Sequence, residues 1–164
     1  MERFIKIRIE EYHSPEELGD NDRELLNLAI KATSSSYSPY SAFKVGAAVR
    51  LANGVILCGS NQENAAYPSG LCAERVVMFY AQSQYPDTAI ETIAIFADPD
   101  DFRLDRPVTP CGSCRQVMAE YEHRQGNKIR VIMGGANGLV QVTESIESLL
   151  PLMFVMEKLK KRKS

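Results

Sequence analysis

Three of the four cysteines lie in two short motifs whose spacing suits metal binding. Cys111 and Cys114 form a C-x-x-C pair, which lets two thiolates from one turn bind a single ion, and Cys72 could supply a third thiolate from another helix start. Three protein ligands leave the fourth position of a zinc ion open. That is typical of a catalytic site, because a water bound there can lose a proton near neutral pH.

Charged residues next to the cysteines could assist such a site. Glu74, two residues after Cys72, could take a proton from the bound water and donate it elsewhere, or could be a helix-start carboxylate that only complements the helix dipole. Arg75 or Arg115 could offset the negative charge of the thiolates, or could form ordinary surface ion pairs.

A structural zinc site, or a set of buried thiols, is the alternative for the three cysteines. A closed structural site needs a fourth ligand. Cys58 is expected inside a strand as a small core residue, and neither His13 nor His123 has ligand-like spacing to the cysteine motifs. These features favour a catalytic site.

The bulk composition restricts the class of protein. The 164 residues, 45% of them hydrophobic, suit one domain with a sizeable core. A net charge of -2 with scattered basic residues argues against nucleic acid as a partner. Residues 1–8 are unlike a signal peptide and no apolar run is long enough to cross a bilayer, so we expect no membrane association and a cytoplasmic protein. In a reducing compartment, metal binding is a commoner role for cysteines than disulfide formation.

The pattern of apolar residues predicts an α/β protein. A capping box of Asn21 and Glu24 is expected to start the first helix, and the dipeptide Asn53-Gly54 predicts a hairpin. The alternation of Ile5, Ile7 and Ile9 with charged residues predicts a half-buried strand at a sheet edge or a subunit contact. Further strands are expected over 43–51, 55–59, 90–97, 129–133 and 139–142, and helices over 21–32, 72–84, 111–125 and 144–150.

The order of these elements constrains the topology. Two successive strand-helix-strand units imply parallel strands with crossover helices, with both cysteine motifs at the carboxyl ends of strands. The link over 134–138 is too short for a parallel crossover, which needs about a dozen residues. The last strand must therefore turn back antiparallel.

The sequences Cys72-Ala73-Glu74 and Pro110-Cys111-Gly112-Ser113-Cys114 resemble the C-A-E and P-C-x-x-C motifs of the zinc-dependent cytidine deaminases. The resemblance covers roughly residues 21–154. It implies a three-layer α-β-α sandwich around a mixed, roughly five-stranded sheet, and one zinc ion per subunit. We expect a single domain over 1–164, with an N-terminal extension over 1–20 and a basic tail over 155–164.

The resemblance also implies an activity, the hydrolysis of cytidine and deoxycytidine to the uridine nucleosides and ammonia in pyrimidine salvage. Glu74 would take the proton of the zinc-bound water, deliver it to N3 of the base, and carry a second proton to the departing amine. Arg75 would balance the charge of the thiolates, as its family counterpart does. The alternatives are a deaminase of another aminopyrimidine such as blasticidin, a polynucleotide-editing deaminase, and a structural zinc domain without activity.

Substrate-binding residues follow from further resemblances. Asn61 and Glu63 resemble a ribose-binding pair, and in an extended segment their side chains point the same way, although a polar loop with local hydrogen bonds is the alternative. Phe43 resembles an aromatic that packs against the base, although it could simply be core. Ala73 is assigned to the same substrate-binding set.

The segment over 149–154 resembles a C-terminal signature of the family. In that signature a phenylalanine crosses into the site of a neighbouring subunit, so Phe154 would stack on a base bound by another chain. The resemblance therefore implies a homotetramer whose sites are shared between subunits.

Overall fold

The computed structural model describes residues 1–155, so the expected basic tail lies outside the described residues except for Val155. Its sheet contains the six strands β1 (Glu10–Tyr12), β2 (Phe43–Leu51), β3 (Ile56–Ser60), β4 (Ile90–Pro99), β5 (Arg130–Gly134) and β6 (Val140–Thr143). Its three α-helices are α1 (Asp20–Ala32), α2 (Ala73–Gln84) and α3 (Gly112–Gln125). None of the helices within residues 1–155 is long and apolar enough to cross a membrane.

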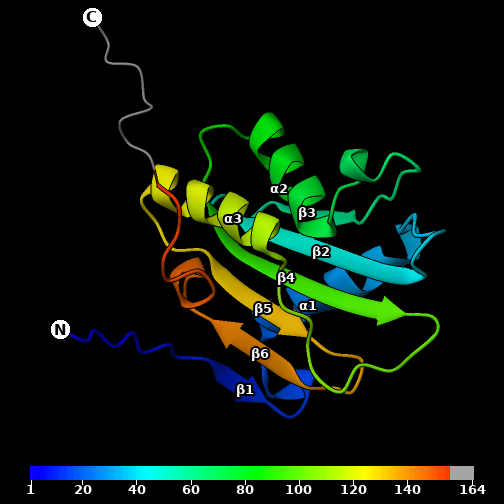
Figure 1. Cartoon of the computed structure of the whole chain (residues 1–164), viewed down its shortest axis with the longest axis horizontal. Coiled ribbons are helices and arrows are strands. Elements are labelled where there is room, and N and C mark those ends of the chain that lie inside the picture. Colours follow the sequence, from blue (N-terminus) through cyan, green and yellow to red (C-terminus); the bar gives the residue numbers. More distant parts are fainter. Residues whose placement is uncertain (156–164) are drawn as a thin grey trace, which may run out of the picture.

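The helices cover both faces of the sheet, with α2 and α3 on one face and α1 on the other (Figure 1). Side chains of each strand alternate between the two cores, because successive residues of a strand point to opposite faces. In β2, Ala47 and Val49 face the core under α2 and α3, whereas Ala48 faces the core under α1. The three-layer prediction is therefore confirmed.

The strands lie in the order β1-β6-β5-β4-β2-β3. β4 and β5 are parallel and joined by α3, whereas β6 is antiparallel to β5, which confirms the prediction for the last strand. β3 and β4 are both antiparallel to β2, so they run in the same direction with β2 between them. Since β3 leads to α2 and β4 leads to α3, both helices start at the same end of the strands, where β3 and β4 terminate.

The strand predicted over Ile5–Ile9 is wrong. The chain pairs with β6 only over Glu10–Tyr12, and residues 1–9 are exposed. Glu10 lies opposite Val142, so Ile9 would face Thr143, where β6 ends. Residues before Ile9 therefore have no neighbouring strand within residues 1–155. The strand at this edge of the sheet is instead β1, which accounts for the sixth strand.

Three other local predictions also need correction. α1 begins at Asp20 after Gly19, without a side-chain cap, and Glu24 instead binds Arg50 at 2.9 Å. The helix expected over 144–150 is only a 3₁₀ turn over Ile146–Ser148, because Thr143 stays in β6. Cys58 is exposed on the edge strand β3 and not in the core.

Gly46 allows α1 to approach β2 closely. A Cβ atom at this position would lie 2.0 Å from the carbonyl oxygen of Ala29 in α1, a distance that no side chain could tolerate. The contact places the end of α1, and the 3₁₀ turn Thr33–Ser35 that follows it, directly against β2. The chain then continues through Ser36 into the loop that precedes Phe43.

Candidate active site

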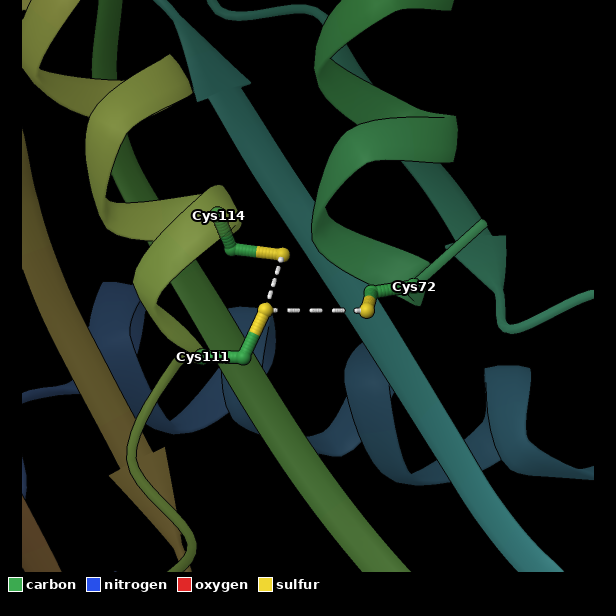
Figure 2. Close-up of side chains that lie close together, drawn as sticks. All are labelled: Cys72, Cys111 and Cys114. Carbon is green, nitrogen blue, oxygen red and sulfur yellow. Dashed lines mark hydrogen bonds between the residues drawn. The ribbon is translucent and has the colours of Figure 1, made fainter. Parts of the chain in front are cut away.

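The three sulfur atoms meet where α2 and α3 begin (Figure 2). Cys72 and Cys111 are the residues that precede the first turns of α2 and α3, and Cys114 lies in the first turn of α3. The Sγ atom of Cys111 lies 3.9 Å from that of Cys72 and 3.5 Å from that of Cys114. All three sulfurs lie within 4.8 Å of one another.

This arrangement fits a zinc ion. A tetrahedral site with Zn–S bonds of about 2.3 Å places its sulfurs about 3.8 Å apart, which is close to the two separations observed. Within residues 1–155, the three cysteines form the only cluster of histidine, cysteine and acidic side chains close enough to hold a metal ion. Three thiolates leave one tetrahedral position for a further ligand.

The pKa shifts of two of the thiols suit metal binding. A hydrogen bond from the Cys114 thiol and the guanidinium of Arg75 lower the pKa of Cys72 to about 5. The same interaction with Cys72, together with burial, raises the pKa of Cys114 above its ordinary value. The lowered pKa of Cys72 favours a thiolate at this position, and the thiolate is the form of cysteine that binds a metal ion.

Glu74 is buried beside this cluster, with only 5% of its surface exposed. Burial is the main cause that raises the pKa of its carboxyl group, and the nearby negative charge of Cys72 adds to the effect. A carboxyl group with a raised pKa can both take up and release a proton near neutral pH. The geometry therefore suits the proton transfer predicted for Glu74.

The two candidate arginines have different positions. Nη2 of Arg75 lies 3.8 Å from the sulfur of Cys72. Arg115 instead donates hydrogen bonds to the carbonyl oxygens of Pro110 and Leu149 at 2.7 and 2.8 Å, so it fixes the chain on either side of α3. Arg75 alone therefore adds charge to a sulfur by direct contact, whereas Arg115 supports the backbone before Cys111.

The side chain of Asn61 is buried and bound to the start of β2. Its Oδ1 atom accepts hydrogen bonds from the backbone N–H of Val45 at 2.8 Å and from the hydroxyl of Ser36 at 2.6 Å. Its Nδ2 group donates to the carbonyl of Phe43 at 2.8 Å. Both acceptor sites of the amide oxygen are occupied, and one hydrogen of the NH₂ group remains to be donated.

Glu63 is bound to the loop before Phe43. Its Oε2 atom accepts from the backbone N–H groups of Tyr40 and Ser41, at 2.9 and 3.3 Å, and its Oε1 atom accepts from the hydroxyl of Ser41 at 2.5 Å. These bonds, the Ser41 hydroxyl first, lower the pKa of Glu63. A carboxylate has about four acceptor sites, so about one remains on Glu63.

Asn61 and Glu63 therefore offer complementary groups to a ligand. Asn61 has one hydrogen left to donate and Glu63 has about one acceptor site left. A hydroxyl group both accepts and donates a hydrogen bond, so it satisfies both residues at once. Asn61, Glu63 and Cys72 border the same hollow of about 290 Å³, which joins the predicted sugar segment to the metal cluster.

Comparison with known proteins agrees with this geometry. Residues 20–127 match the family model of the cytidine and deoxycytidylate deaminase zinc-binding region. A cytidine deaminase from Halalkalibacterium halodurans is 40% identical over 137 residues, which cover 83% of this chain and 96% of that protein. The chain belongs to this deaminase family. It is a zinc-dependent hydrolytic deaminase.

Two further relatives are similar to this chain over most of its length. The crystal structure of a cytidine deaminase from Burkholderia pseudomallei matches with a TM-score of 0.71 and 34% identity, over 84% of this chain and all of that chain. A blasticidin-S deaminase from Bacillus cereus is 29% identical over 140 residues, which cover 84% of this chain and 94% of that protein. Proteins named for different aminopyrimidine substrates therefore resemble this deaminase.

Two other predicted substrate residues, Phe43 and Ala73, do not line the hollow. Phe43 is half-buried, and its ring stacks on Phe102 with 6.0 Å between centroids, so it is not among the residues that line the hollow. Ala73 is fully buried at the first position of α2, between Cys72 and Glu74. The prediction that Phe43 and Ala73 bind the substrate therefore stays a prediction.

Phe154 is exposed and does not line the hollow that Asn61, Glu63 and Cys72 border. It is 64% exposed, and its backbone N–H and carbonyl are held by the side-chain amide of Gln116, at 3.3 and 2.8 Å. The sequence reasoning missed Gln116, as it missed Ser36 and Ser41. Their partners lie 22 to 38 residues away in the chain, so no local pattern indicates them.

Proposed function

We propose that this deaminase hydrolyses cytidine and deoxycytidine to uridine and deoxyuridine, with release of ammonia, in cytoplasmic pyrimidine salvage. The observation that carries the proposal is the pair of complementary free groups on Asn61 and Glu63, in the hollow that Cys72 also borders. A sugar hydroxyl satisfies that pair. The relatives named cytidine deaminases support the same substrate class.

The chemistry divides between the metal and Glu74. Zinc bound by Cys72, Cys111 and Cys114 would supply an activated water for attack on C4 of the base. Glu74 would accept a proton, deliver it to N3 of the pyrimidine, and then carry a second proton to the departing amine. Its burial beside Cys72 supports this role, because a raised pKa lets one carboxyl group act first as base and then as acid.

The remaining residues would bind the substrate or balance the charge of the metal ligands. Arg75 would offset the negative charge of the thiolates through its contact with Cys72. Phe43 would pack against the base and Ala73 would contact it from the start of α2. Asn61 and Glu63 would bind the sugar. The net charge of -2 supports a small-molecule substrate, without nucleic acid or a membrane as partner.

We further propose a homotetramer in which Phe154 completes the site of a neighbouring subunit. The exposed ring on a backbone fixed by Gln116 supports this role. Chains carrying Glu74→Gln would lack proton transfer, and chains carrying Phe154→Ala would lack the ring. Co-purified mixtures of the two are expected to regain cytidine turnover, because Glu74→Gln chains supply Phe154 to intact sites on their neighbours.

A matched mixture provides the control. Chains carrying both Glu74→Gln and Phe154→Ala have no ring to supply, so mixing them with Phe154→Ala chains should restore nothing. Equal activity in the two mixtures, measured as the initial rate with cytidine, would show that Phe154 acts within its own chain or not at all.

The test of the substrate is conversion of cytidine by zinc-loaded protein, followed by the loss of ultraviolet absorbance. Deoxycytidine, cytidine monophosphate and blasticidin S are tested in parallel. We expect turnover of both nucleosides and little of the nucleotide. Turnover of blasticidin S alone would overturn the proposed substrate and leave the deaminase chemistry in place.

A further inference from the structure

Ser41 contacts both the proposed sugar-binding carboxylate and the residue proposed to pack against the base. Its backbone N–H and its hydroxyl both donate to Glu63, at 3.3 and 2.5 Å. The same hydroxyl accepts a hydrogen bond from the backbone N–H of Phe43 at 3.1 Å. One small side chain therefore links two parts of the candidate substrate site that come from different segments.

The backbone next to Ser41 is strained in a way that makes this link possible. Ala42 has a φ of 52°, and it is the only non-glycine residue among residues 1–155 with a positive φ. Its N–H donates to Ser38 and its carbonyl accepts from Asp100, both at 3.0 Å. Such conformations persist only where surrounding contacts fix them, and they occur often at ligand-binding sites.

Ala42 lies between Ser41 and Phe43 in the chain. The turn at Ala42 therefore lies between the two groups of one hydrogen bond, in which the N–H of Phe43 donates to the Ser41 hydroxyl. The same hydroxyl occupies one acceptor site of Glu63, and the N–H groups of Tyr40 and Ser41 occupy two more. Without the hydroxyl, Oε1 of Glu63 would have no protein donor among these three. Its carboxylate could then rotate or bind water in place of a ligand.

We propose that Ser41 is a positioning residue that directs the remaining acceptor site of Glu63 toward a sugar hydroxyl, and so determines how strongly the enzyme prefers nucleosides that carry one. The inference rests on the proposed function, in which Glu63 binds the ribose. The lowered pKa of Glu63 agrees with it, since the Ser41 hydroxyl is the main cause that keeps this carboxylate ionised.

The test compares cytidine with 2′,3′-dideoxycytidine, which lacks both ring hydroxyls. Ser41→Ala is expected to raise KM for cytidine about tenfold, with kcat within about twofold, because a contact to a charged group that orients the substrate is lost. The kcat/KM for dideoxycytidine is expected to change by less than about twofold, because that substrate has no ring hydroxyl for Glu63 to bind. The preference for cytidine should therefore fall about tenfold.

Two variants control for loop folding. Ser41→Thr keeps a hydroxyl and is expected to restore most of the preference. Ser34→Ala removes a nearby serine hydroxyl that donates to the carbonyl of Lys31, and it should leave the preference unchanged. Zinc content and thermal midpoint are measured for every variant to confirm that each is folded and loaded.

The outcomes separate this inference from the proposed function. An equal loss with both nucleosides in Ser41→Ala would show a purely structural loop contact and overturn the inference alone. Wild-type enzyme that converts cytidine and dideoxycytidine equally well would overturn Glu63 as a sugar ligand and the inference with it. Wild-type enzyme that converts no cytidine would overturn the proposed substrate itself.

Discussion

The metal cluster and the Asn61–Glu63 segment border one hollow but are held in different ways. The cysteines occupy the starts of two helices whose inner faces are buried against the sheet, so secondary structure and core packing fix them. Asn61 and Glu63 belong to irregular chain, and side-chain hydrogen bonds to residues 16 to 25 positions away fix them. The core therefore fixes the candidate metal ligands, whereas a polar network fixes the residues proposed to bind the sugar.

This difference predicts two kinds of mutational response. Loss of a metal ligand or of Glu74 removes a thiolate or a proton-transfer group that no other residue replaces. Loss of one hydrogen bond in the polar network leaves the others in place, so the effect should be graded and should fall mainly on KM. The following substitutions test the contrast from the largest expected effect to the smallest.

Cys111→Ala is expected to abolish activity, because the two remaining thiolates are one fewer than the three protein ligands that a catalytic zinc site needs. Elemental analysis of the purified variant should find far less than one zinc ion per chain. The matched control is Cys58→Ala, which removes an exposed cysteine on β3 and should keep both zinc and activity. Stoichiometric zinc in Cys111→Ala would refute its role as a ligand.

Glu74→Gln is expected to lower kcat about 10²–10⁴-fold, the usual contribution of a general acid and base. The side chains have the same size, so fold and zinc content should be unchanged. Steady-state kinetics and elemental analysis on the same sample test both parts. Turnover at the wild-type rate would show that another group moves the proton.

Asn61→Asp is expected to raise KM for cytidine about 100-fold, because the carboxylate can donate neither to the Phe43 carbonyl nor to a sugar hydroxyl. It can still accept from Val45 and Ser36, but a carboxylate oxygen in place of Nδ2 would repel the Phe43 carbonyl, so the stability of the variant is measured as well. Kinetics with cytidine, with circular dichroism as the folding control, make the measurement. An unchanged KM would assign Asn61 to the scaffold alone.

Arg75→Gln is expected to lower kcat about tenfold while most of the zinc is retained, because loss of a partner to a metal ligand is usually milder than loss of the ligand. The variant removes the positive charge that lies 3.8 Å from the Cys72 sulfur. Kinetics and zinc content are compared with wild type. Unchanged kcat would favour an ordinary surface role for this arginine.

Local signals account for the parts of the fold that were predicted correctly. The Asn53-Gly54 turn indicated the β2–β3 hairpin. The cysteine spacing indicated the metal cluster, because two of its ligands are in one helical turn. In these cases the determining interactions lie within a few residues of each other.

The predictions that failed depend on distant partners. The alternation over Ile5–Ile9 is typical of a strand, but whether it pairs depends on where β6 ends, more than 130 residues later in the chain. Likewise, the sequence indicated Asn61 as a sugar-binding residue. It did not indicate that Asn61 supports β2, because the hydrogen bonds to Ser36 and Val45 form only when the fold is complete.

The position of the cysteines also links the free zinc concentration to the stability of the folded chain. Cys72 and Cys111 are 39 residues apart and start different helices, so one ion bound to both ties α2 to α3 much as a covalent cross-link would. An ion that binds the folded form better than the unfolded chain stabilises it more as its free concentration rises. The melting temperature of this enzyme should therefore report the free zinc concentration around it.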